Sequence, residues 1–286
     1  MNRRTFLQTV AIGVAARPTS AAKLPIRKAV EFSMLPKEMT IGERFRIAKE
    51  AGFEQIECPT TPDPTEAAEM KAAAEKTGLR IHSVMNMDHW KYPLSSPDPE
   101  VVAKSLKGIE TSLHNAHLWG ADAVLVVPAV VNPGVSYAQA YERSKTQIRK
   151  ILPLAEELKI IIGIEEVWNK FLLSPLEFAT YIDSFQSPWV RAYFDVGNVV
   201  LYGYPQDWIR TLGKRIVKLH IKDFYFRQQS AKWVGLGEGD IDWKAIHAAL
   251  AEIGYQGTAT VELTGGDAAY LADVNHRFDK ILRGEM

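Results

Sequence analysis

The chain of 286 residues contains one cysteine and no surplus of charge of either sign. A single cysteine, Cys58, excludes an internal disulfide bond and a cysteine-rich zinc site. The 34 basic and 34 acidic residues leave a formal net charge of zero. Proteins that bind nucleic acid or an anionic membrane surface need an excess of basic residues. We therefore expect no nucleic-acid partner.

Glycine-rich phosphate loops and long apolar runs are also missing. No GxGxxG pattern follows a first strand-like run and no GxxxxGK[ST] pattern occurs, which argues against a dinucleotide-binding fold and a phosphate loop. The apolar run near the N-terminus, Val10–Ala16, is far too short to span a bilayer, so we expect no stable membrane anchor. With 47% hydrophobic residues, the chain still has ample material for a buried core.

The first residues have the pattern of an export signal. The pair Arg3-Arg4 is followed by the apolar run and then by small residues through Ala22. This arrangement resembles a twin-arginine signal, which serves proteins that fold before they cross the membrane. We expect residues 1–22 to be the signal, residues 23–286 to form one catalytic domain, and the mature protein to be periplasmic. A disordered basic tail is the alternative interpretation.

Strand-like apolar runs alternate with amphipathic helical segments through the rest of the chain. The expected strands are Ala29–Met34, Gln55–Cys58, Arg80–Met85, Ala123–Pro128, Ile160–Glu166, Val190–Asp195, Ile216–Ile221 and Thr258–Leu263. The expected helices are Thr40–Ala51, Pro64–Thr77, Asp98–Trp119, Ser136–Leu158, Ser174–Phe185, Pro205–Leu212, Trp243–Ile253 and Asp267–Leu282. Such alternation predicts parallel βα units. Eight units in about 260 residues favour an α/β fold that is a single (β/α)8 TIM barrel.

Polar side chains that can bind a metal end four consecutive expected strands. These endings offer Glu165 or Glu166, then Asp195, His220 and Glu262. In such a barrel the C-terminal ends of the strands form the active face. Three carboxylates this close would repel one another unless a cation lay between them. The sequence therefore predicts one divalent ion (Mn, Mg, Co or Zn) with open positions for two oxygens of a polyol or hydroxyketone.

The neighbouring acids Glu165 and Glu166 raise a question of direction. Successive side chains of a strand point to opposite faces, so only one of the two can face the barrel interior. The residues alone do not decide which one.

Six segments carry a family resemblance. They are Gly52–Glu57, Glu166–Asn169, Phe194–Asn198, His220–Asp223, Gly237–Trp243 and Val261–Leu263. Together they resemble the xylose isomerase-like barrels often called sugar phosphate isomerases/epimerases, the group of tagatose 3-epimerase, hydroxypyruvate isomerase and inosose dehydratase. The resemblance covers nearly all of the chain after the signal and is specific for the superfamily, not for one substrate.

The resemblance implies a role for each strand-end residue. In the family's Glu-x-x-Asn/Asp pattern the metal ligand is the Glu three residues before the Asn, here Glu166, so Glu165 is expected to face outward. Asp195 and His220 resemble the next two ligands, and Glu262 a ligand that also handles a proton. Glu166 and Glu262 would then be the catalytic pair on opposite faces of the substrate carbon.

Other residues are expected around the substrate or behind the ligands. The expected substrate-binding residues are His82, Trp168, Asn198, Lys222 and Lys232, and the expected supporting residues behind the ligands are Glu57, Asn169 and Asp223. For His82 a core role is an equal alternative. Lys218 has the same strand parity as His220, so we expect it inside the barrel, paired with Glu31 or Glu57.

The chain departs from the epimerases of this group in ways that keep several reactions open. A histidine usual three residues after the strand-six aspartate is replaced by Asn198, which cannot shuttle a proton. The leading prediction is a metal-dependent sugar isomerase or epimerase that transfers a proton through an enediolate of a small ketose. A dehydratase or eliminase on a keto-sugar, keto-inositol or 3-keto-glycoside is the alternative, and a non-catalytic sugar-binding barrel is a further one. Barrels of this kind often dimerise, so a homodimer is also expected.

Overall fold

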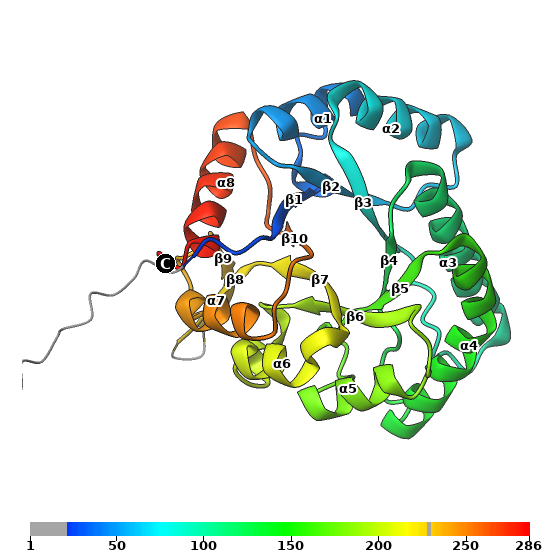
Figure 1. Cartoon of the computed structure of the whole chain (residues 1–286). Helices are drawn as coiled ribbons and strands as arrows, with labels where there is room; N and C mark the ends of the chain where they lie inside the picture. The colour runs from blue at the N-terminus through cyan, green and yellow to red at the C-terminus, as the bar shows by residue number, and fades with distance from the viewer. Residues whose placement is uncertain (1–21, 228–229) are drawn as a thin grey trace, which may run out of the picture.

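The computed structural model describes residues 22–227 and 230–286, and eight strands of this part close into a parallel barrel (Figure 1). The barrel strands are β1 (Arg27–Glu31), β2 (Gln55–Pro59), β3 (Arg80–Met85), β4 (Ala123–Val126), β5 (Ile161–Ile164), β6 (Val190–Asp195), β7 (Ile216–Ile221) and β10 (Thr258–Val261). Pairing of β1 with both β2 and β10 closes the ring. The predicted (β/α)8 fold is confirmed, whereas the expected export signal lies, except for Ala22, outside the described residues.

A ring of helices surrounds the barrel (Figure 1). The helices are α1 (Ile41–Glu50), α2 (Pro64–Thr77), α3 (Pro99–Trp119), α4 (Tyr137–Leu158), α5 (Pro175–Asp183), α6 (Pro205–Leu212), α7 (Trp243–Glu252) and α8 (Ala268–Leu282). Local signals explain their bounds: α2 begins after Asp63, whose carboxylate accepts from the Thr65 N–H, and ends at Gly78 with φ of 64°. In the described part of the chain, no helix has the length and apolar character needed to cross a membrane.

The barrel has an apolar outer layer and a polar interior. Ile162 and Ile164 of β5 belong to the large core between strands and helices. The barrel interior instead holds buried polar groups, among them Glu57, His82 and Thr260. The His82 Nε2 atom lies 3.0 Å from the Thr260 hydroxyl, so two of these interior groups are partners of each other. These buried polar side chains can therefore support a polar site at the C-terminal ends of the barrel strands.

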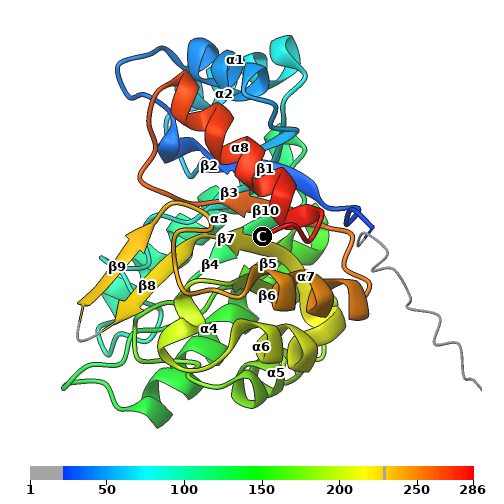
Figure 2. The ribbon, with the colours of Figure 1, turned by 90° about the vertical axis from the view of Figure 1, so that its left-hand side faces the viewer.

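A short antiparallel hairpin, β8 (Asp223–Arg227) with β9 (Ser230–Val234), follows β7 and was not predicted. Figure 2 shows the hairpin projecting away from the ring of strands. Several predicted strand ends also differ, and two of them bear on the site. The segment Phe32–Met34 is a 3-10 helix after β1, and β5 ends at Ile164, so Glu165 and Glu166 lie beyond the strand.

Candidate active site

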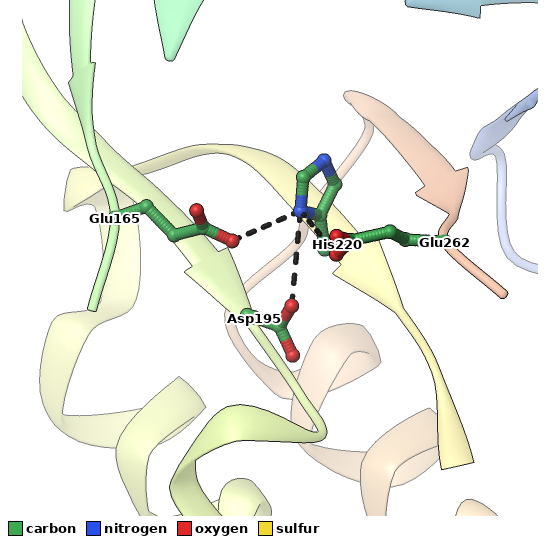
Figure 3. A group of neighbouring side chains, drawn as sticks. All are labelled: Glu165, Asp195, His220 and Glu262. Atoms are coloured by element: carbon green, nitrogen blue, oxygen red, sulfur yellow. Dashed lines mark hydrogen bonds and ion pairs between the residues drawn. The ribbon is translucent and has the colours of Figure 1, made fainter. Parts of the chain in front are cut away.

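Four side chains meet where four barrel strands end. Glu165 follows β5, Asp195 ends β6, His220 lies near the end of β7 and Glu262 follows β10. One ligand atom from each of the four lies within 4.8 Å of the other three (Figure 3). Three of the residues are buried and Glu262 is partly exposed. Because parallel strands present their C-terminal ends on one face, these distant positions form one cluster.

The His220 Nδ1 atom is the centre of the cluster. It lies 2.9 Å from Glu165 Oε1, 3.2 Å from Glu262 Oε2 and 3.7 Å from Asp195 Oδ2. Glu165 and Glu262 approach this nitrogen from opposite sides (Figure 3). The three carboxylate oxygens and the nitrogen therefore converge on one point.

The prediction that Glu166 faces the cluster and Glu165 faces outward is wrong. Gly163 and Glu165 point to the same side, the barrel interior. A Cβ on Gly163 would lie 3.0 Å from the Tyr193 ring inside the barrel. Ile162 and Ile164 point to the helical layer, and Glu166 continues their direction. The family spacing counted three residues back from Asn169, but the chain turns tightly there, with the Asn169 N–H donating to the Val167 carbonyl at 2.8 Å. Residue counting across that turn does not give side-chain direction.

Glu166 lies behind the cluster and supports β6. Its side chain is 1% exposed, and its Oε1 atom accepts a hydrogen bond from the Asp195 N–H at 3.0 Å. Burial, reinforced by the charge of Asp195, raises the pKa of Glu166 well above its ordinary value. Glu166 therefore holds the strand that carries Asp195.

Glu57 supports the cluster from below, as expected. Its Oε1 atom lies 3.2 Å from His220 Nε2, and the Tyr193 hydroxyl donates to its other oxygen. Burial favours the neutral imidazole, but the acidic groups around it, Tyr193 and Glu57 foremost, hold the pKa of His220 well above its usual range. A carboxylate on Nε2 leaves Nδ1 directed at the other acids.

Lys222 reaches the cluster from the loop between β7 and β8. Its ammonium lies 2.8 Å from Asp195 Oδ2 and 2.6 Å from Glu262 Oε2. Burial alone would raise the pKa of Glu262, but Lys222 and His220 hold it well below its usual range. For Glu165 burial prevails over His220, so its pKa rises to about 7. Two acids on either side of one imidazole therefore have different proton affinities.

A cavity of about 280 Å³ opens onto the cluster. Its lining residues are Met85, Met87, His89, Trp90, Leu125, Glu165, Val167, Trp168, Asn198, Lys222, Trp233 and Glu262. Three of the expected substrate-binding residues, Trp168, Asn198 and Lys222, are among them. The Trp168 and Trp233 rings stack with centroids 4.9 Å apart and form an aromatic wall. Larger hollows, of about 470 and 510 Å³, lie elsewhere on the surface and include no residue of the cluster.

Two expected substrate-binding residues lie away from this cavity. His82 is fully buried inside the barrel, where it contacts Thr260. Lys232 is exposed on β9, with its ammonium 5.7 Å from the centre of the Tyr225 ring. The first side chain lies below the barrel mouth. The second lies on the strand next to the wall residue Trp233 but is not part of the cavity lining.

Two expected supporting residues hold loops, and their described interactions include none with the three acids and the imidazole of the cluster. The Asn169 amide donates to the Ala129 carbonyl at 2.6 Å and accepts from the Phe171 N–H. Asp223 accepts from the Gly237 N–H at 2.8 Å and from the Trp243 indole at 3.0 Å. Asp223 therefore joins the start of the hairpin to the loop before α7.

Glu31 is a neighbour of the site that the sequence analysis did not propose for it. It ends β1, and burial raises its pKa to about 7, with the charge of Glu262 as the next contribution. The Ser33 hydroxyl donates to it at 2.6 Å. No strand-end signal for it was available in the sequence, because the expected strand Ala29–Met34 continued past Glu31, whereas β1 ends at it.

The fold and the site define a class of protein: a (β/α)8 barrel with three carboxylates and an imidazole converging at its C-terminal face. The chain belongs to the xylose isomerase-like TIM barrel family, whose family model matches residues 45–279.

Individual relatives are more distant. The L-ribulose-5-phosphate 3-epimerase UlaE of Salmonella paratyphi C (strain RKS4594) is 24% identical over 257 residues, which are 83% of this chain and 88% of that protein. A solved D-tagatose 3-epimerase-like protein superposes with a TM-score of 0.76 at 18% identity, over 90% of this chain and 98% of the other. The 3-keto-D-glucoside 4-epimerase YcjR from E. coli gives a TM-score of 0.74 at 19% identity, over 88% and 98%. These likenesses to solved structures show the shared fold.

Proposed function

We propose that this protein is a divalent-metal-dependent isomerase or epimerase of a small, unphosphorylated carbohydrate. The observation that carries the proposal is the convergence of Glu165, Asp195, His220 and Glu262 beside a cavity with an aromatic wall. The relatives named as sugar epimerases support the reaction class.

The donor set suits a divalent ion. Metal–ligand bonds of about 2.1 Å in octahedral geometry place neighbouring ligand atoms about 3 Å apart and opposite ones about 4.2 Å apart. The His220 Nδ1 distances of 2.9 to 3.7 Å and the 4.8 Å limit of the cluster are close to these values. Glu165, Asp195, His220 and Glu262 would hold the ion. When bound, it supplies positive charge that polarises a substrate carbonyl and stabilises negative charge on its oxygen.

The proton is transferred by two carboxylates of the chain. Glu165 and Glu262 face each other across His220, so a substrate carbon between them is accessible from both sides (Figure 3). One carboxylate takes the proton next to the carbonyl and the other returns a proton. Removal from one face and return to the other gives epimerisation, and return to the neighbouring carbon gives isomerisation. The Glu166–Glu262 pair expected from the sequence is thus replaced by Glu165 and Glu262.

The cavity favours an uncharged substrate. Among the described residues that line it, Lys222 is the one lysine or arginine, and its ammonium already contacts Asp195 and Glu262. A phosphate dianion would need free donors or cations and would be repelled by the acids. The apolar C–H face of a sugar can instead pack on Trp168 and Trp233.

Proton exchange in D2O tests the proposal. The Mn-loaded protein is incubated with free ketoses, keto-inositols, 3-keto-glycosides and matched 5-phosphates, and each is followed by NMR. We expect deuterium at one carbon of an unphosphorylated sugar with its skeleton intact, and at least a hundredfold slower exchange for Glu262→Gln. Loss of water or of an aglycone would replace the proposal by the eliminase alternative. No exchange with metal bound would replace it by the sugar-binding barrel.

We also propose that the protein is exported to the periplasm. The support is the arginine pair and the apolar run near the N-terminus, a segment outside the described residues. Replacing Arg3 and Arg4 by lysine should leave the protein in the cytoplasmic fraction of a host with twin-arginine export. Unchanged fractionation would contradict the proposal. The homodimer stays a prediction.

A further inference from the structure

Lys222 contacts two of the four residues that would hold the metal. Its ammonium lies between Asp195 Oδ2 and Glu262 Oε2, and its side chain is 11% exposed. The same two oxygens face His220 Nδ1, at 3.7 and 3.2 Å. The ammonium and a bound metal would therefore share oxygens.

The surrounding chain is shaped to keep this lysine in place. A Cβ on Gly197 would lie 2.5 Å from Lys222 Cγ, so the glycine leaves room for the lysine stem. The ammonium also lies 5.0 Å from the centre of the Trp233 ring. The N–H groups of Gly197 and Asn198 donate to Asp195 Oδ1, at 2.7 and 2.8 Å, which leaves Oδ2 directed toward Lys222. The loop after β6 and the hairpin together hold Lys222.

The balance of charges at the metal site indicates the role of Lys222. The ionised carboxylates of Glu165, Asp195 and Glu262 carry three negative charges, of which a divalent ion neutralises two. Lys222, whose side chain is largely buried, supplies the third positive charge. We propose that Lys222 is a fixed counter-cation of the metal site, a positioning residue that orients Asp195 and Glu262 and weakens the binding of the divalent ion. This inference rests on the metal-binding part of the proposed function.

Two effects of the Lys222 ammonium weaken the binding of the divalent ion. The ammonium withdraws electron density from the oxygens that the ion needs, and its charge repels the ion at short range in a site of low dielectric constant. Loss of Lys222 therefore leaves the oxygens free for the ion. A residue that only contacted substrate would not change metal affinity in the absence of substrate.

The test compares metal affinity in matched lysine variants. Metal-free wild type, Lys222→Met and Lys232→Met are titrated with MnCl2 by calorimetry, and free Mn²⁺ is followed by EPR. Lys232 is the control, because it is one residue from Trp233, carries the same charge and contacts Tyr225. We expect Lys222→Met to bind Mn²⁺ at least tenfold more tightly, Lys232→Met to stay within twofold of wild type, and Lys222→Arg to restore weaker binding.

Equal or weaker binding by Lys222→Met overturns the inference. If that variant does not fold without metal, Lys222→Gln is judged by the same criterion. The two proposals fail separately: tighter binding in a protein that exchanges no sugar proton supports the inference and contradicts the reaction. Proton exchange with unchanged Mn²⁺ affinity in Lys222→Met does the reverse. No Mn²⁺ binding by wild type or any variant overturns both.

Discussion

At the scale of single residues, Glu165 and Glu166 show how much direction matters. Both are buried and acidic, yet Glu165 contacts His220 and Glu166 contacts the Asp195 backbone. Burial raises the pKa of each above its ordinary value. Adjacent residues of one type therefore have separate tasks, one at the cluster and one in the wall behind it.

This difference predicts opposite results for two matched substitutions. Glu165→Gln should lower Mn²⁺ affinity at least tenfold, because an anionic ligand is lost. Glu166→Gln should keep affinity within about twofold, because its amide oxygen can still accept from the Asp195 N–H and Glu166 is not one of the four cluster residues. Calorimetric titration of both variants is the measurement. A larger loss in Glu166→Gln would return the ligand role to Glu166.

Lys218 lies inside the barrel, as expected. The expectation that it pairs with Glu31 or Glu57 is wrong. Its ammonium contacts Asp122 Oδ1 at 2.6 Å, with side-chain exposures of 6% and 45%. Arg80 contacts the other oxygen of Asp122 at 2.9 Å. The partner comes from the start of β4, at the barrel end away from the cluster. A buried ammonium with one carboxylate partner makes that partner important for stability.

We predict that Asp122→Asn lowers the free energy of unfolding by about 2 kcal/mol, since it leaves the Lys218 ammonium buried without a counter-charge. Urea denaturation measures the change, and the double variant Asp122→Asn/Lys218→Met should recover part of the loss. A double variant less stable than Asp122→Asn would show that the ammonium is satisfied without its partner.

The same pair predicts a pH dependence. Burial opposes the charge of Asp122, but Lys218 and Arg80 outweigh it and lower its pKa below the ordinary value. A carboxyl with a lower pKa in the folded state stabilises the fold above its unfolded pKa, and this contribution is lost as the pH falls through the folded value. The stability of wild type should therefore fall more steeply than that of Asp122→Asn below about pH 4.

At the scale of elements, the hairpin β8–β9 completes one wall of the cavity. Its register pairs Phe224 with Trp233, and Trp233 stacks on Trp168 from the loop after β5. Asp223 fixes the base of the hairpin through Gly237 and Trp243. The element lies outside the barrel, so its effect should be on substrate binding and not on barrel formation.

Two aromatic substitutions in the hairpin test this role. Trp233→Ala should raise KM for the exchanged sugar about tenfold with a smaller change in kcat, because an aromatic packing face is lost. Phe226→Ala is the control: Phe226 is 58% exposed on β8 and is not part of the cavity lining. Steady-state kinetics of both variants give the comparison. Equal KM values for the two variants would remove Trp233 from the substrate wall.

At the scale of the whole molecule, barrel closure makes distant strand ends into neighbours. Residues 165 and 262 approach one nitrogen of His220 only because β5, β7 and β10 are parallel members of one ring. The ring order also leaves the apolar layer outside and the polar groups inside. Stability and chemistry are therefore assigned to different faces of the same strands.

The sequence by itself determined the barrel, most element bounds and the set of strand ends that carry the site. Helix α2 was predicted with its observed bounds because Asp63 and Gly78 are local signals that act within one turn. Asp195, His220 and Glu262 were proposed because each lies at the end of an expected strand, which is also a local signal.

Which polar groups meet depends on the tertiary structure. Glu165 meets His220 of β7, and Asp223 contacts the loop before α7. Lys222 meets Asp195 and Glu262, and Lys218 meets Asp122, across different strands. These outcomes depend on contacts between residues far apart in the chain, and no local pattern specifies which of several acids a buried lysine reaches.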